Sequence, residues 1–250
     1  MDRGPDWRWK AFVAGFHKLG LDVSDRPRHR PNDVLVVWNR SPTLDREAKV
    51  HTANGGKVIV AENGYIGKCP KGFPMYALAL DQHNGAGRWP VGEENRWHSF
   101  GIEDRPFRVS GEHILLLPQR GIGPPGVGMP KNWVADVTRR LSQITKRPVK
   151  VRPHPGQSRP KMDDDLHNCW AAVTWGSGAA IKALVAGVPV FHEMKNWIGA
   201  PAAKFGIDDI ENPYLGDRMP MLHRLSWAQW SVDDIATGRP FDALLKMEDA

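Results

Sequence analysis

The feature that most constrains this chain is the alternation of short apolar runs with amphipathic segments along most of its length. Apolar runs bounded by Gly, Pro, Asn or Asp predict buried strands. Spacing of apolar residues at three and four positions predicts helices between them. Alternation of this kind favours parallel sheets covered by helices on both faces. The predicted strands are 33–38, 57–61, 74–80, 113–118, 149–155, 170–175 and 188–191, and the predicted helices are 7–19, 45–53, 133–145, 163–167, 179–186 and 221–230.

The pattern stops after residue 90 and restarts at His113. A chain of 250 residues has room for one large domain or two small ones. We therefore predict an α/β protein of two doubly wound halves that face each other over a cleft. The expected parts are an acceptor-side domain at 1–108, a donor-binding domain at 109–220, and a C-terminal helix with a polar tail at 221–250 that packs back toward the first domain.

Composition narrows the class of protein. Apolar residues make up 41% and charged residues 25%, which is a globular profile. Neither a secretory signal nor an apolar run of about 18 residues is present, so we expect a cytoplasmic protein without a membrane span. Two cysteines, Cys69 and Cys169, cannot form a disulfide framework or a zinc site. The formal net charge of +6 favours polyanionic partners.

Two neighbouring segments carry the clearest functional signal. Residues 174–178 read Thr-Trp-Gly-Ser-Gly and join a strand to a helix. Free backbone N–H groups at such a turn form an anion site, and the glycines allow a phosphate to approach closely. The same turn also fits a simple helix start. One strand–helix unit earlier, residues 151–155 read Val-Arg-Pro-His-Pro.

Together these segments resemble the nucleotide-sugar half of GT-B glycosyltransferases, which are built from two Rossmann-like domains, and most closely the capsule and Kdo-transferase type. The resemblance covers residues 113–192. It implies a nucleotide-sugar donor, which we expect to be of the UDP-glucose type. In that family an acidic residue often lies on the helix that follows this turn. This chain has Lys182 at that position, so we expect Glu193 to take the role of the acidic residue. The donor-binding residues that the resemblance implies are Gln119, Arg120, Arg152, His154, Trp175, Gly176, Ser177, Gly178 and Glu193.

An acidic triplet, Asp163 to Asp165, offers an alternative to the metal-free interpretation. It fits an Asp-x-Asp metal loop. It also fits the first turn of a helix, where carboxylates complement the positive end of the helix dipole. We favour the helix start and predict no metal.

Transfer to a hydroxyl needs a general base. Asp81 at the end of a predicted strand is the first choice, followed by His83 and by Glu62, which is expected after strand 57–61. Arginines beside aromatic residues, including Arg96 and Trp97, fit a DNA backbone and an extruded base. The expected acceptor residues are Arg28, Arg30, Asn63, Tyr65, Arg88 and Trp89.

Residues 77–90 and 118–128 also resemble small glycosyltransferase-like proteins of tailed phages. The predicted acceptor is therefore a 5-hydroxymethylpyrimidine base, such as 5-hydroxymethylcytosine, in double-stranded phage DNA, and the location would be the host cytoplasm. Two alternatives stay open: a capsule or lipopolysaccharide sugar transferase, and a non-catalytic nucleotide- or nucleic-acid-binding module.

Overall fold

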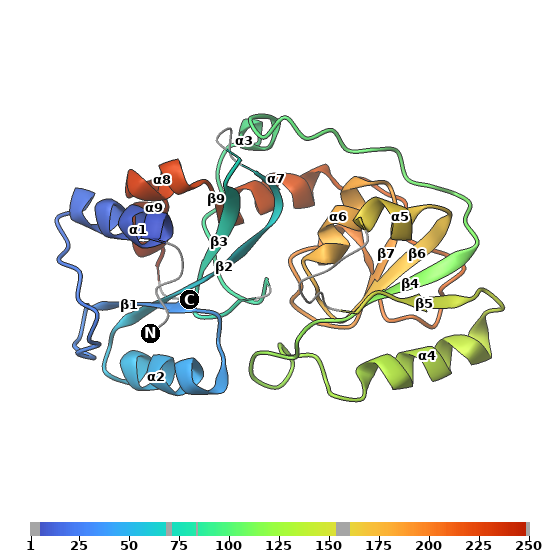
Figure 1. The fold of residues 1–250 in the computed structure, drawn as a ribbon, viewed down its shortest axis with the longest axis horizontal. Helices are drawn as coiled ribbons and strands as arrows, with labels where there is room; N and C mark the ends of the chain where they lie inside the picture. The colour runs from blue at the N-terminus through green and yellow to red at the C-terminus, as the bar shows by residue number, and fades with distance from the viewer. Residues whose placement is uncertain (1–5, 69–71, 84, 154–160, 249–250) are drawn as a thin grey trace. The chain divides into compact units, whose positions relative to one another are not determined.

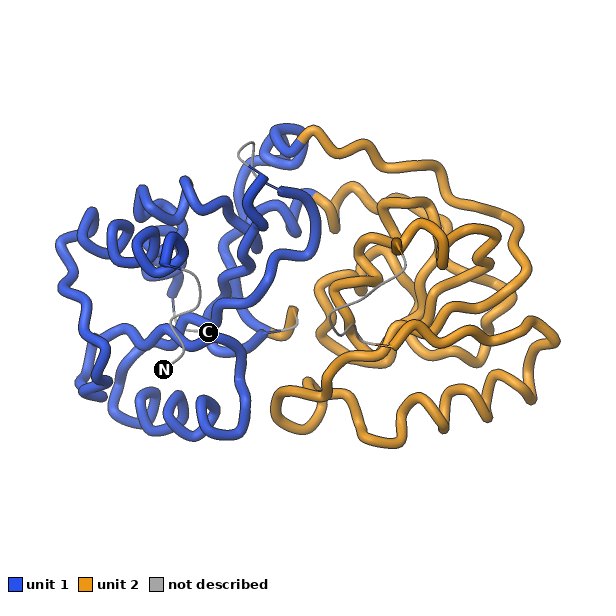
Figure 2. Tube along the Cα trace, viewed as in Figure 1, with its two compact units in different colours: residues 1–83, 87–100, 223–250 blue, residues 84–86, 101–222 orange. Residues whose placement is uncertain are grey.

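A computed structural model describes residues 6–68, 72–83, 85–153 and 161–248. The chain forms two compact units (Figure 2). Unit 1 comprises residues 1–83, 87–100 and 223–250, and unit 2 comprises residues 84–86 and 101–222. Each unit has its own β-sheet (Figure 1).

Unit 1 contains a four-stranded sheet with the order β1-β2-β3-β9. Only β1 and β2 are parallel, whereas β3 runs antiparallel to both β2 and β9. The prediction of a doubly wound parallel sheet is therefore wrong for this unit. Residues 69–73 alone join β2 to β3, and a parallel crossover needs about a dozen residues or more. The bounds are β1 Val34–Trp38, β2 Lys57–Lys68, β3 Pro74–Leu80 and β9 Gln229–Trp230.

Strand β2 is much longer than the predicted 57–61. It continues through Glu62 and Tyr65, with a register shift against β3 between Asn63 and Lys68. Glu62 was expected just after the end of this strand, and that expectation is wrong. The apolar run that indicated the strand ends at Ala61, and the polar residues after it gave no signal that the strand continues.

Helices cover both faces of the first sheet. Helix α2, Pro42–Ala53, packs on one face, where Leu35 and Val37 of β1 are buried. Helix α1 lies on the other side of β1 together with α8 and α9, and the Phe16 and Phe241 rings stack at 4.0 Å (Figure 1). The remaining bounds are α1 Asp6–Lys18, α3 Asn95–His98, α8 Val232–Ala236 and α9 Arg239–Leu245.

Residues 231–245 correct the prediction of a polar tail, because they form α8 and α9. Ser231 begins α8 with a capping box: its Oγ accepts from the Asp234 N–H at 3.0 Å, and the Asp234 carboxylate accepts from the Ser231 N–H at 3.2 Å. Strand β9 pairs with β3, and α8 contacts α1, so the chain end belongs to unit 1.

Unit 2 contains a five-stranded, entirely parallel sheet with the order β5-β4-β6-β7-β8. The prediction of an α/β fold with a parallel sheet and helices is confirmed here. Its core includes Ile114 and Leu116 of β4 and Val137 and Leu141 of α4. The bounds are β4 His113–Leu117, α4 Trp133–Ile144, β5 Val149–Val151, α5 Met162–Leu166, β6 Cys169–Thr174, α6 Ala179–Val185, β7 Val190–His192, a 3-10 turn Ala200–Ala202 and β8 Lys204–Phe205.

Helix α7, Met219–Ala228, leads the chain out of unit 2 and into unit 1. None of the helices in the described part of the chain is long and apolar enough to cross a membrane.

Candidate functional site

The carboxyl ends of four neighbouring strands define the candidate site in unit 2. Counted along the chain, strands β4 to β8 have the spatial order 2-1-3-4-5. In this topology the chain leaves β4 toward one side and returns to place β6 on the other. Ligands bind in the crevice where the order reverses, outside the carboxyl ends of the strands. In unit 2 this position is between the ends of β4 and β6.

The strand register shows which residues follow these ends. Leu117 is the partner of Thr174, and Thr174 is the partner of His192. The loop that contains Gln119 and the turn that contains Gly176 therefore start side by side. The predicted donor residues that the structure describes therefore lie at one edge of this sheet.

Gln119 is the most informative of these residues. Both polar atoms of its amide are buried, and neither has a hydrogen-bond partner among the described residues. A Cβ added at Gly176 would lie 3.2 Å from Gln119 Nε2 and 2.7 Å from Met194 Sδ, so Gly176 keeps the turn close to the amide. An unpaired buried amide costs about 1–3 kcal/mol, and a bound ligand can supply the missing partner.

The turn after β6 is held rigidly. The Thr174 hydroxyl donates to the Leu117 carbonyl at 2.8 Å and accepts from the Ser177 N–H at 2.8 Å. The Ser177 hydroxyl accepts from the Ala179 N–H at 3.2 Å, and Gly178 precedes α6. Thr174 is not among the residues predicted for the site, although a Thr at the end of a buried strand is visible in the sequence.

A glycine-rich loop borders the same edge. Gly121, Gly123 and Gly126 all have positive φ angles, between 70° and 127°, which glycine adopts without strain. The Trp175 indole donates to the Val127 carbonyl at 3.0 Å and fastens the loop to the turn. Arg120 begins this loop and is exposed.

Two predicted donor residues are tied to protein partners. Arg152, just after β5, forms a salt bridge with Asp165 of α5, and its side chain is 13% exposed. Glu193, just after β7, accepts from the Trp133 indole at 2.7 Å and from Arg140 at 2.6 Å. The hydrogen bond to Glu193 raises the pKa of Arg140. His154 lies outside the described residues.

The acidic triplet forms the first turn of α5, with Asp165 directed to Arg152. No group of three or more metal-ligating side chains occurs in the part of the chain that the structure describes.

In unit 1, Asp81 directly follows β3 and has a φ of 72°. Its carboxylate accepts from Arg88 Nε at 2.9 Å, and its side chain is 47% exposed. The Asp81 carbonyl accepts from buried Arg40, whose guanidinium also pairs with Asp45 at 2.7 Å. Arg40 was missed by the sequence analysis. The result is an accessible carboxylate on a fixed backbone, with a cation beside it.

The other predictions for unit 1 fall in different places. His83 is buried, and Glu62 on β2 accepts from the Tyr65 hydroxyl at 3.0 Å. Asn63 on β2 is exposed. Trp89 is 5% exposed with the Arg224 guanidinium 4.7 Å from its ring centroid. Arg28 and Arg30 are exposed on the connection between α1 and β1.

Comparison with known proteins supports this fold. Neither a protein-family model nor a curated protein matches the chain by sequence. Two solved structures of KpsC from Thermosulfurimonas dismutans do match it. The structure titled beta Kdo 2,4 transferase matches with a TM-score of 0.52 and 15% identity over 90% of this chain and 88% of that one. The structure titled beta Kdo 2,7 transferase has the same TM-score and identity over 96% and 97%.

These likenesses show that the chain shares the fold of the two structures over nearly its whole length. They give no support to the phage part of the resemblance.

Proposed function

We propose that the protein is a glycosyltransferase that uses a nucleotide-sugar donor, and that the donor binds at the β4/β6 edge of unit 2. The observation that carries the proposal is the unpaired, buried Gln119 amide at the point where the strand order reverses. The likeness in fold to two Kdo transferases, over nearly the whole chain, supports the same class.

The chemistry of this edge suits a nucleotide. The Gln119 amide offers both a donor and an acceptor, as the edge of a nucleobase requires. Exposed Arg120 follows Gln119 and makes no ion pair within the described ranges. Its guanidinium can therefore pair with a diphosphate. The turn at Ser177 and the glycine-rich loop would let the protein backbone lie close to the nucleotide. No metal is part of the proposal.

We propose a saccharide acceptor of the capsule or lipopolysaccharide type rather than DNA. The arginine–tryptophan pairs that suggested DNA have structural contacts, whereas Arg28 and Arg30 are exposed. Arg96 is 4.0 Å from the Trp230 ring centroid and its side chain is 9% exposed. Trp89 and Trp97 are buried, and Arg88 pairs with Asp81. Few of these arginines are therefore available to contact the phosphate backbone of DNA.

Substituting Gln119 by Leu should weaken nucleotide binding roughly 10-fold, because two neutral hydrogen bonds are lost. The same change removes a buried orphan amide, so the free energy of unfolding should stay the same or rise. Calorimetry with UDP, CMP and GDP measures the affinity, and thermal unfolding measures the stability.

Gln143→Leu is the matched control, because Gln143 is exposed on α4. It should leave nucleotide affinity unchanged. Equal affinity in wild type and Gln119→Leu, with both proteins folded, would remove Gln119 from the donor site. A loss of stability in Gln119→Leu would indicate a structural role instead.

A further inference from the structure

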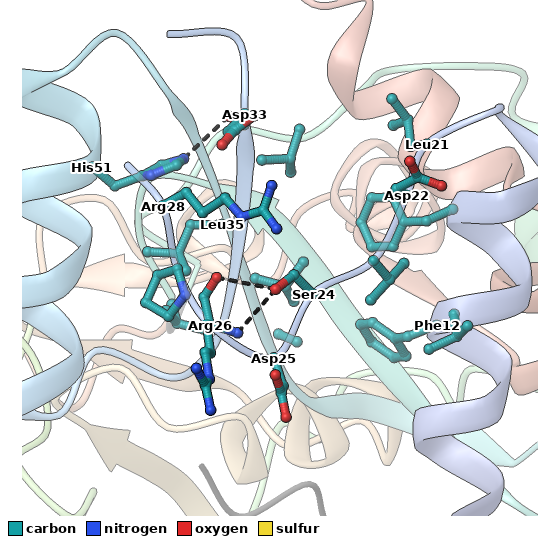
Figure 3. A pocket seen from close by; sticks show the side chains of 18 of the residues that line it. Phe12, Leu21, Asp22, Ser24, Asp25, Arg26, Arg28, Asp33, Leu35 and His51 are labelled. Carbon is teal, nitrogen blue, oxygen red and sulfur yellow. Dashed lines mark hydrogen bonds between the residues drawn. The ribbon is translucent and has the colours of Figure 1, made fainter. Parts of the chain in front are cut away.

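Unit 1 contains a pocket that plays no part in the proposed transfer. Its volume is about 500 Å³, which lies within the range of small-molecule sites. Helix α1, strand β1 and the connection between them enclose it (Figure 3). The pocket lies wholly among residues of unit 1.

The walls of the pocket are apolar and incompletely covered. Residues of β1 alternate between two faces, and Leu35 and Val37 are buried against α2. Val34 and Val36 therefore face the α1 side, where they line the pocket and are only partly buried. Phe12 of α1 lines the opposite wall and is also partly buried.

Arg28 supplies an available positive charge. It is exposed, lines the pocket, and makes no hydrogen bond or ion pair with any described residue. In Figure 3 its guanidinium reaches from the connecting segment toward the middle of the hollow, whereas the ends of Asp25 and Arg26 point away. Arg8 of α1 also lines the pocket, and its guanidinium lies 4.1 Å from the Trp38 ring centroid.

The connecting segment is anchored, so the pocket is formed before any ligand arrives. His29 Nδ1 is 3.4 Å from His51 Nδ1, and His29 Nε2 is 3.3 Å from the Glu47 carboxylate. His51 Nε2 lies 3.1 Å from the Asp33 carbonyl, and the Asn32 N–H donates to the Gly55 carbonyl. Preformed sites lose less entropy on binding.

The carboxylates on the rim limit the charge of the ligand. Asp22, Asp25 and Asp33 all line the pocket. They would repel a polyphosphate or a nucleic acid, while a single negative charge can pair with Arg28 alone.

We propose that this pocket binds a small amphiphilic monoanion, with its apolar body between α1 and β1 and its anionic group at Arg28. The proposal does not rest on the transferase activity.

Two fluorescent probes with nearly the same body test it on the full chain: 1-anilinonaphthalene-8-sulfonate, which has one sulfonate, and N-phenyl-1-naphthylamine, which is neutral. Wild type should bind both with a stoichiometry of one. Arg28→Gln should weaken the sulfonate probe about 10- to 100-fold, the value of a charge-assisted hydrogen bond, and leave the neutral probe unchanged. Val36→Trp should weaken the binding of both probes, because the larger side chain fills the pocket.

Arg30→Gln is the matched control, because Arg30 is on the same segment but does not line the pocket. It should bind both probes like wild type, and UMP or pyrophosphate should displace neither probe. Val13→Trp repeats the filling test from α1 if Val36→Trp does not fold. An Arg28→Gln protein that binds the sulfonate probe like wild type would overturn the proposal. So would an equal loss in Arg30→Gln, or full binding in the filled variants.

Discussion

Asp81→Asn should lower kcat about 10²- to 10⁴-fold, because an amide cannot accept the proton of an acceptor hydroxyl. The substitution keeps the backbone in place, since Asn tolerates the positive φ of 72° that Ala would strain. It loses the salt bridge to Arg88, which is partly exposed and contributes at most about 1 kcal/mol. Nucleotide affinity should not change. Initial rates at saturating donor, combined with calorimetry, measure both quantities.

Asp242→Asn is the matched control. Asp242 of α9 pairs with Lys246, its side chain is 44% exposed, and it has no place in the proposed chemistry. If Asp81→Asn retains a third or more of the wild-type kcat, Asp81 is not the base. A fall in kcat of the same size in Asp242→Asn would show that the loss is not specific to Asp81.

Arg218→Leu should lower the free energy of unfolding by about 3 kcal/mol, the value of a buried charge pair broken on one side. The Arg218 side chain is 7% exposed and donates to Asp104 at 2.7 and 2.9 Å. It also donates to the carbonyls of Leu184, at 2.7 Å, and Arg105, and its guanidinium lies 4.5 Å from the Phe107 ring centroid. Leu would remove the donor to the Asp104 carboxylate and the Arg105 carbonyl, whereas the Leu184 carbonyl would keep the Gly187 N–H at 3.1 Å.

Urea unfolding followed by circular dichroism measures the effect. Arg224→Leu is the control: Arg224 is exposed and makes a cation–π contact with Trp89, so about 1 kcal/mol or less should be lost. A change below about 1 kcal/mol in Arg218→Leu would show that this network does not stabilise unit 2.

The sequence predicts the parallel sheet well because its signal is local. Strands buried on both faces are continuous apolar runs, as at Ile114–Leu117, and such runs need no knowledge of their neighbours. The direction of β3 was not predicted correctly, because the periodicity of apolar residues does not encode strand direction. The short connection at 69–73 does contain that information, and it predicts an antiparallel pair. Ser231 and Asp234 likewise show the spacing of a capping box in the sequence, so α8 was predictable.

The site could be predicted only in part. The strand ends locate Gln119 and Ser177, but the burial of the Gln119 amide depends on Gly176 and Met194, which are remote in sequence. Arg96 and Trp97 resemble a nucleic-acid surface in the sequence, yet they pack inside unit 1. The pocket beside Arg28 also has no sequence signal, because it results from α1 covering β1 incompletely.

The most direct measurement of the central claim is mass spectrometry of acceptors after incubation with nucleotide sugars. The full chain would be supplied with UDP-glucose, CMP-Kdo and related donors, together with capsule-type oligosaccharides or hydroxymethylated DNA, with and without EDTA. We expect release of the nucleotide and a sugar-sized mass increase on a saccharide. EDTA should not diminish this product, and Gln119→Leu should reduce it at donor concentrations near the Kd. A mass increase on DNA alone would contradict the proposed acceptor. Absence of nucleotide binding and of transfer with every donor would contradict the transferase itself.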